Sequence, residues 1–492
     1  MHLWVRKPVA ALEAEAGESH LSLKRTLGAS SLVALGIGAI IGAGLFVRTA
    51  AAAATSAGPA VTFGFIVAAL GCAFAGLCYA ELAAMLPISG SAYTYTYATM
   101  GELVAWIIGW DLTLEYALGA ATVAIAWSEY LNKLLELAGT QVPYAWCHSP
   151  FQVDAVSHAH GIINLPALGI LVILTALLVR GIHESALVNL VIVAVKLAIV
   201  VLIIAFGWSH IDPLNHTPYI PPPSEYQDKQ GIVHHFGGAL GILGAAGIVF
   251  FAFIGFDAVS TAAQEAKNPK RDMPIGILGS LVICTVLYVL FAHVLTGLEP
   301  VEFFRTRGSE ASVVQAIQQA MPDDRWLANL VIVAILGGFS SVILVLLMGQ
   351  SRVFYAMSRD GLVPRAFSEL HPRFRSPYKS NLLFLGFVGL FAAFVPGDVA
   401  GDMTSIGTLF AFILVSLGVW ILRVREPNLA RPFRVPAVPV VSSLGALVCG
   451  AMIFGLGWLN WLRLGVWLAI GLAVYFGYGA HHSKVARAAH LE

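Results

Sequence analysis

Long stretches of apolar residues alternate with short polar segments along almost the whole chain. A helix that crosses a membrane needs about 20 mainly apolar residues, and a window of that length predicts twelve such helices. Their expected ranges are 29–57, 60–86, 102–136, 162–179, 185–208, 237–265, 275–298, 326–358, 381–396, 402–422, 437–459 and 463–481. The pattern therefore predicts an all-α polytopic membrane protein, with boundaries that can shift by several residues.

The composition agrees with this pattern. Of 492 residues, 58% are hydrophobic and only 11% are charged, whereas soluble domains carry about 25% charged residues. A soluble globular enzyme is therefore excluded. The formal net charge is +0, and nucleic acid is excluded as a partner because a surface that binds a polyanion needs clustered Lys and Arg.

Lys and Arg are distributed unequally between the two sets of loops. With the predicted spans, 20 of the 28 lie on the side that holds both termini, and 6 lie on the other side. Positively charged loops stay on the cytoplasmic side. The sequence therefore predicts a cytoplasmic N-terminal segment (1–28), one transmembrane domain (29–481) and a cytoplasmic tail (482–492). Residues 1–28 lack the apolar core and cleavage site of a signal peptide.

The first and sixth spans contain helix-breaking sequences. Four glycines fall between Gly36 and Gly44, and each interior glycine costs a helix about 1 kcal/mol. In the sixth span, Gly255 is followed closely by the acidic Asp257. Breaks at corresponding positions five spans apart indicate an inverted-repeat transporter and mark its binding site, because unwound backbone is tolerated only where it lines a cavity. Close helix packing, as at GxxxG motifs, is the alternative.

Cysteine and histidine positions indicate no metal and no cofactor. The five cysteines are scattered, without the spacing of a zinc site or a disulfide framework. Only His293 lies clearly inside a predicted span, whereas a haem or metal enzyme in the membrane would need paired histidines at that depth. No nucleophile with a neighbouring base is visible. We therefore expect a protein that is not an enzyme.

Three tyrosines alternate in the connection at residues 87–101, namely Tyr93, Tyr95 and Tyr97. Alternation of this kind can form a ligand surface. Because tyrosine is enriched where membrane and water meet, the sequence favours an interfacial role for all three.

Five segments of the chain carry a resemblance to a known family. They are GIGAIIGAGLFV (36–47), YAELAAMLPISGSAYTYTY (79–97), GWDLTLEYALG (109–119), FFAFIGFDAVSTAAQEAKNPKRDMPIGI (250–277) and SRVFYAMSRDGLVP (351–364). Their joint order is similar to that of the amino acid, polyamine and organocation (APC) superfamily, and within it the cationic amino acid transporter family. The resemblance implies the LeuT-type fold: twelve helices in two inverted five-helix repeats (about 29–208 and 237–422) plus two more (about 437–481), with helices one and six unwound.

The resemblance also implies a substrate site at the two breaks. The backbone amides of the first break resemble those that hold the substrate carboxylate, and several carbonyls resemble those that hold its ammonium. The expected carboxylate-binding residues are Ile41, Gly42, Ala43 and Gly44. The expected ammonium-binding residues are Ile40, Phe251, Ala252 and Ile254, and the aromatic gate candidates are Phe251 and Phe253.

Charged residues inside the predicted spans are functional candidates because a charge at that depth is costly. Lys196 lies roughly 16 Å from either end of the fifth span, and in proton-coupled relatives a lysine on this helix resembles a replacement for a sodium ion, directed at the carbonyls of the first break. Glu115 is predicted to neutralise Lys196 or to assist the proton path, with a packing role as the alternative. Asp111, one turn away, is predicted to be structural. Asp257 is predicted to cap a half-helix or to pair with Arg48.

The eighth span carries no acid, and recognition of a guanidinium or a second ammonium in a dry pocket needs a carboxylate or several acceptors. The sequence therefore favours small neutral L-amino acids such as alanine, with cationic amino acids as the alternative. The expected mechanism is proton symport by alternating access across the plasma membrane of a bacterium. A proton-independent uniporter or exchanger, or a receptor that does not transport, is the other alternative. Expected partners are the amino acid, protons and membrane lipids; a monomer is compatible with the sequence, and an accessory subunit is left open.

Overall fold

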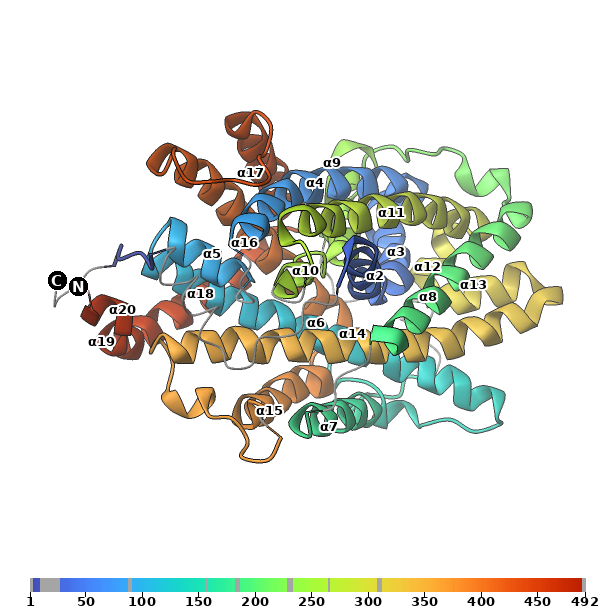
Figure 1. Cartoon of the computed structure of the whole chain (residues 1–492). Helices are drawn as coiled ribbons and strands as arrows, with labels where there is room; N and C mark the ends of the chain where they lie inside the picture. The colour runs from blue at the N-terminus through green and yellow to red at the C-terminus, as the bar shows by residue number, and fades with distance from the viewer. Residues whose placement is uncertain are drawn as a thin grey trace.

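The computed structural model describes residues 3–8, 27–86, 91–154, 157–181, 186–227, 233–263, 266–307, 312–374 and 376–488. Within these ranges most residues are helical, and two short strands pair antiparallel. The two longest helices, α6 (Glu102–Leu137) and α14 (Arg325–Arg359), pack against each other through the middle of the molecule (Figure 1). The other helices surround this pair.

The remaining elements follow in chain order. The α-helices are α2 (Ala29–Ile40), α3 (Thr49–Ala52), α4 (Val61–Met85), α5 (Ser91–Thr99), α7 (Leu165–Val179), α8 (Ala186–Gly207), α9 (Gly238–Val249), α10 (Ala258–Thr261), α11 (Pro269–Leu298), α12 (Val301–Arg307), α13 (Ser312–Ala320), α15 (Tyr378–Phe394), α16 (Gly397–Arg425), α17 (Val438–Gly455), α18 (Trp458–Val474), α19 (Ala480–His482) and α20 (Lys484–Ala488). Short 3₁₀ and π-helical turns include η1 (Gly44–Arg48), η2 (Ala53–Ala57), η3 (Gly58–Ala60), η6 (Pro213–His216), η7 (Phe250–Phe253) and η11 (Tyr475–Gly479), and the strands are β1 (Ser224–Gln227) and β2 (Val233–Phe236).

The helices have the length and surface of a membrane protein. In the described part of the chain, eight helical stretches are long and apolar enough to cross a membrane, and four shorter apolar helices accompany them. Large apolar side chains also point outward: Val282 and Val286 on α11 are 62% and 55% exposed, and Leu190 on α8 is 51% exposed. A soluble protein rarely exposes so much contiguous apolar surface. The chain is therefore a multi-pass membrane protein.

Each predicted span overlaps one of these apolar helices. Some boundaries moved: α18 starts at Trp458 rather than at residue 463, and α16, whose first residues include Asp398 and Asp402, starts at Gly397 rather than at residue 402. Hydropathy alone misses such starts because a helix continues into the polar interface, where its backbone hydrogen bonds are still made.

The first described residues lie at the same end of the molecule as the last helices. The ammonium of Lys7 donates to Oδ1 of Asp360 at 2.8 Å, and the amide of Lys484 donates to the carbonyl of Asp360 at 3.0 Å. The amide of Glu102 donates to the carbonyl of Val5 at 3.0 Å. Figure 1 shows α19 and α20 at this end, beside α5. Residues 3–8 and the C-terminal helices therefore lie on one side of the protein.

The three tyrosines of α5 are not at an interface with lipid and water. Tyr93, Tyr95 and Tyr97 are each at most 1% exposed. The hydroxyl of Tyr93 donates to Asp360 at 2.7 Å, and that of Tyr97 donates to Glu102 at 2.7 Å. The predicted interfacial role was wrong, because all three side chains are buried and the hydroxyls of Tyr93 and Tyr97 satisfy buried carboxylates where α5 meets the ends of other helices.

Candidate functional site

The first helix is interrupted at its glycines. Helix α2 ends at Ile40, Ile41 has extended backbone (φ −74°, ψ 105°), and a π-helical turn begins at Gly44. A Cβ atom on Gly42 would lie 3.2 Å from the side chain of Val342 on α14, and one on Gly44 would overlap the backbone of Ala252. The glycines therefore let a second helix and the second break approach the first break closely.

The second interruption follows η7. Ile254 has extended backbone (φ −59°, ψ 132°), and Gly255 has φ +117°, a conformation that L side chains rarely adopt. A Cβ atom on Gly255 would also lie 2.9 Å from the carbonyl of Ala39 in α2. Glycine is needed here both for the backbone turn and for contact with the first helix.

All nine residues of the expected substrate site are brought together where the two breaks meet, and all nine are buried. Ile40, Ala43, Phe251 and Ile254 are 2%, 1%, 5% and 7% exposed. Phe253 packs against Phe65 and Tyr288, with ring centroids 6.2 and 5.3 Å apart. The gate candidate Phe253 thus belongs to a packed aromatic cluster.

Tyr288 on α11 joins the two breaks and was missed by the sequence reasoning. Its hydroxyl lies 3.0 Å from the carbonyl oxygens of both Ile40 and Ala252, to which it donates. These are two of the carbonyls expected to hold a substrate ammonium. The signal in the sequence is a tyrosine in the middle of an apolar span, because a buried phenol needs a hydrogen-bond partner.

Lys196 reaches from α8 to the first helix. It is 4% exposed, and its ammonium donates to the carbonyl of Gly38 at 2.8 Å. Gly38 lies in the last turn of α2, where carbonyls have lost their helical partners. The break therefore supplies the acceptor that the buried lysine needs.

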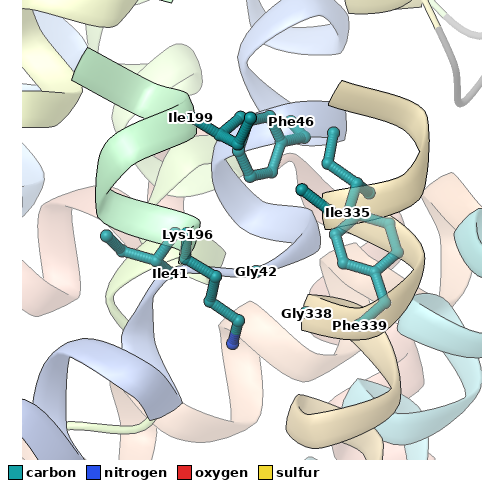
Figure 2. Close-up of a pocket in the computed structure, with 9 residues that line it drawn as sticks. Ile41, Gly42, Phe46, Lys196, Ile199, Ile335, Gly338 and Phe339 are labelled. Atoms are coloured by element: carbon teal, nitrogen blue, oxygen red, sulfur yellow. The ribbon is translucent and has the colours of Figure 1, made fainter. Parts of the chain in front are cut away.

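A small pocket surrounds the stem of Lys196. Figure 2 shows Lys196 extending between the first break and α14. Apart from Lys196, the lining is apolar and comes from three elements: Ile41, Gly42 and Phe46 at the first break, Ile199 on α8, and Ala334, Ile335, Gly338 and Phe339 on α14. Phe46 packs near Phe339, with ring centroids 6.4 Å apart.

Glu115 lies in a different cluster from Lys196. Its electrostatic neighbours are Asp257 and Asp111, and the hydroxyl of Thr408 on α16 also lies near its carboxylate. The three carboxylates are at most 1% exposed. The hydroxyl of Tyr116 donates to Asp257 at 3.0 Å. The structure therefore gathers three buried acids near the second break and does not pair Glu115 with Lys196.

The two roles predicted for Asp257 were wrong. Arg48 forms its ion pair with Asp402 on α16, and it also donates to the carbonyl of Asp398 at 3.4 Å. Asp257 precedes α10 but makes no capping hydrogen bond with its side chain. The arginine reaches a residue more than 350 positions away in the chain, so nothing local in the sequence points to this partner.

Helix α16 carries ion pairs near both of its ends. Asp402 near its start pairs with Arg48 on η1. Arg423 near its end donates to both oxygens of Glu81 on α4, at 3.1 and 2.5 Å. Buried charges are stable only when paired and hydrogen-bonded. These two pairs tie α16 to the first and second helices at opposite ends.

The sequence of the chain is similar to those of known transporters. The family model described as amino acid permease matches residues 27–471. The branched-chain amino acid permease BcaP of Bacillus subtilis is 45% identical over 96% of this chain and 97% of its own length. The methylthioribose transporter of Bacillus subtilis is 39% identical over 98% of both chains. Cationic amino acid transporter 4 of Homo sapiens is 27% identical over 94% of this chain and 88% of its own length.

Proposed function

Because the chain belongs to the amino acid permease family of the APC superfamily, we propose that it is a secondary transporter that imports neutral L-amino acids together with protons. The observation that carries the proposal is the hydrogen bond from Lys196 to the carbonyl of Gly38, beside the first break. A buried amine that gains and loses a proton there would change what holds the broken helix in place.

The proposed architecture has twelve spans in the LeuT-type arrangement. The broken pairs α2–η1 and α9–α10 are its first and sixth spans, and the substrate lies between them near the midplane. The amides of Ile41 to Gly44 would receive the carboxylate of the substrate, because half-helix N-termini favour anions. The carbonyls of Ile40, Phe251, Ala252 and Ile254 would accept from its ammonium, in part by taking the place of the hydroxyl of Tyr288.

Proton coupling would act through alternating access. We place both termini in the cytoplasm and the protein in the plasma membrane of a bacterium. Protonated Lys196 holds α2 through Gly38, and a substrate favours closure only if it binds the closed state more tightly than the open one. The pairs Arg48–Asp402 and Glu81–Arg423, at opposite ends of α16, would open in turn. Glu115 would serve the proton path from its cluster with Asp257.

The substrate is proposed to be neutral and small, such as alanine. The lining residues beside Lys196 are apolar, and the 45% identical relative is named for branched-chain amino acids, so the range would extend to leucine and valine. Cationic amino acids are the second candidate. The observation that favours them is the buried cluster of Asp111, Glu115 and Asp257, because carboxylates recognise ammonium and guanidinium groups.

Uptake into proteoliposomes tests the proposal. The purified protein would be given labelled L-alanine with an acidic exterior, with an acidic interior, or without a gradient, and with unlabelled leucine, arginine or methylthioribose as competitors. We expect accumulation only with the acidic exterior, and competition by leucine but not by arginine. Equal uptake under every condition would indicate a uniporter or exchanger. Binding without flux would indicate a receptor.

A further inference from the structure

Gly338 lies on α14 directly against the methylene stem of Lys196. A Cβ atom on Gly338 would lie 2.8 Å from Cε of Lys196, 3.4 Å from its Cγ and 3.6 Å from its Cδ. Real Cβ atoms essentially never approach another heavy atom closer than 3.0 Å. Figure 2 shows Gly338 on the α14 side of the pocket and Lys196 entering from α8. No larger residue at position 338 would leave the lysine where it is.

The backbone at position 338 does not require glycine. Helix α14 continues from Arg325 to Arg359 without a break, and Gly338 is not among the glycines with positive φ. A glycine inside a helix costs about 1 kcal/mol relative to alanine. The neighbouring Gly337 is also helical, but a Cβ atom there would meet nothing within 4 Å. The need for glycine at position 338 is therefore spatial and comes from Lys196.

The space at Gly338 fixes how far the lysine can reach. The stem passes between α14 and the pocket wall and ends with its ammonium 2.8 Å from the carbonyl of Gly38. We propose that Gly338 is a positioning residue that keeps Lys196 in hydrogen-bonding reach of α2. This inference rests on the proposed function, because the coupling role belongs to Lys196.

An added methyl group at position 338 has a defined consequence. It crowds Cε of Lys196, so the stem must shift, and the hydrogen bond from the ammonium to the carbonyl of Gly38 is weakened. Because a hydrogen bond to the charged form of a group favours that form, weakening this bond costs the charged lysine more than the neutral one. A more acidic exterior is then needed to protonate it.

The experiment compares Gly338→Ala with Gly337→Ala, two adjacent substitutions with the same gain in helix propensity. Uptake of labelled L-alanine is measured across external pH at a fixed internal pH. For Gly338→Ala we expect accumulation several-fold below native and a half-maximal external pH shifted to lower values. For Gly337→Ala we expect the native profile. Equal profiles for the two variants would overturn the proposal.

The same substitution in the Lys196→Ala background distinguishes an effect that acts through the lysine from an effect on helix packing. In Lys196→Ala the stem is absent, so Gly338→Ala should cause no loss of the alanine exchange that this variant retains and no loss of thermal stability in detergent. A further loss in that background would show that position 338 acts through helix packing and would overturn the proposal. If Gly338→Ala alone fails to fold, recovery of a folded double variant supports the contact, and continued misfolding contradicts it.

The same variants distinguish failure of this inference from failure of the proposed function. Gradient-driven uptake that survives Lys196→Ala contradicts the coupling role of the lysine. Uptake that is lost in Lys196→Ala, together with a native profile in Gly338→Ala, contradicts only the positioning role of the glycine.

Discussion

Two buried charged regions flank the broken helices, and they are built differently. Lys196 is a single cation that donates to the backbone carbonyl of Gly38 from an apolar pocket. In the second region, Asp111, Glu115 and Asp257 form a cluster of acids, and neither oxygen of Asp111 has a hydrogen-bond partner among the described residues. In the first region, a hydrogen bond to Gly38 holds the lysine in place. The second region contains buried carboxylate oxygens that have no hydrogen-bond donor in the described part of the chain.

A direct ion pair between Glu115 and Lys196 would have combined the buried cation and the buried acids in one contact. The structure keeps them in separate regions. Three neighbouring carboxylates cannot all be ionised in a low-dielectric interior without a large cost, so protons or a cation must accompany them. Under the proposed function, Lys196 would set the position of the first helix, and the acids would share the exchange of protons.

The largest effect is expected from removing one acid of the cluster. Glu115→Gln keeps the shape but cannot exchange a proton, so gradient-driven uptake of alanine should fall about tenfold or more, which corresponds to about 1.4 kcal/mol. Exchange of labelled for unlabelled alanine should persist. Glu136→Gln, at a surface pair with Lys133 on the same helix, is the control. Native accumulation in Glu115→Gln would contradict a role for the acids in proton exchange.

A smaller effect is expected at Tyr288, which joins the two helix breaks. Tyr288→Phe removes the hydroxyl that bonds to Ile40 and Ala252 and leaves both carbonyls buried. The loss of a buried hydrogen bond costs about 1 kcal/mol, so KM for alanine should change about fivefold while the dependence on pH stays native. Tyr219→Phe removes a hydroxyl bonded to Thr62 outside the site and serves as the control. A changed pH profile in Tyr288→Phe would make the tyrosine part of the proton path.

The Arg48–Asp402 pair at the start of α16 tests whether an ion pair between helices takes part in proton coupling. Arg48→Gln leaves Asp402 without its partner, and we expect lower thermal stability and uptake reduced about threefold, because breaking a buried pair costs about 3–5 kcal/mol in stability. The pH at half-maximal uptake should not move. Arg463→Gln, which loses a bond to Asn460 elsewhere, is the control. A shifted pH profile in Arg48→Gln would join this pair to the coupling machinery.

The smallest effect is expected in the loop after α6, where His148 pairs with Glu129 outside the site. Burial lowers the pKa of His148, but its hydrogen bonds to Cys147 and Glu129 and the charge of Glu129 outweigh burial and raise the pKa from 6.5 to about 10. A raised pKa means that this contact stabilises the fold fully below pH 6.5 and that the stabilisation is lost as pH rises toward 10. Thermal unfolding should therefore show a small decline over this range that is absent in Glu129→Gln, with alanine uptake at pH 6.5 unchanged. An identical decline in the variant would remove Glu129 as its cause.

Much of the fold could be predicted from the sequence because hydrophobic length and helix-breaking glycines are local signals. Gly42, Gly44 and Gly255 lie at the interruptions that the pattern predicted from helix propensity, and the structure adds a spatial reason, the close approach of Val342, Ala252 and Ala39. The family resemblance also directed Lys196 to the first helix. Contacts between distant segments were not predictable in this way: Arg48 binds Asp402 rather than Asp257, and Tyr288 bridges two carbonyls whose positions depend on the assembled bundle.

The most direct test of the central claim is gradient-driven uptake by Lys196→Ala. Labelled L-alanine would be supplied to proteoliposomes of the native protein and of the variant, each with an acidic exterior and with no gradient, at equal protein content. The account predicts that the acidic exterior drives accumulation only in the native protein, while the variant retains exchange. Equal gradient-driven accumulation in both proteins would show that the lysine does not couple proton movement to transport.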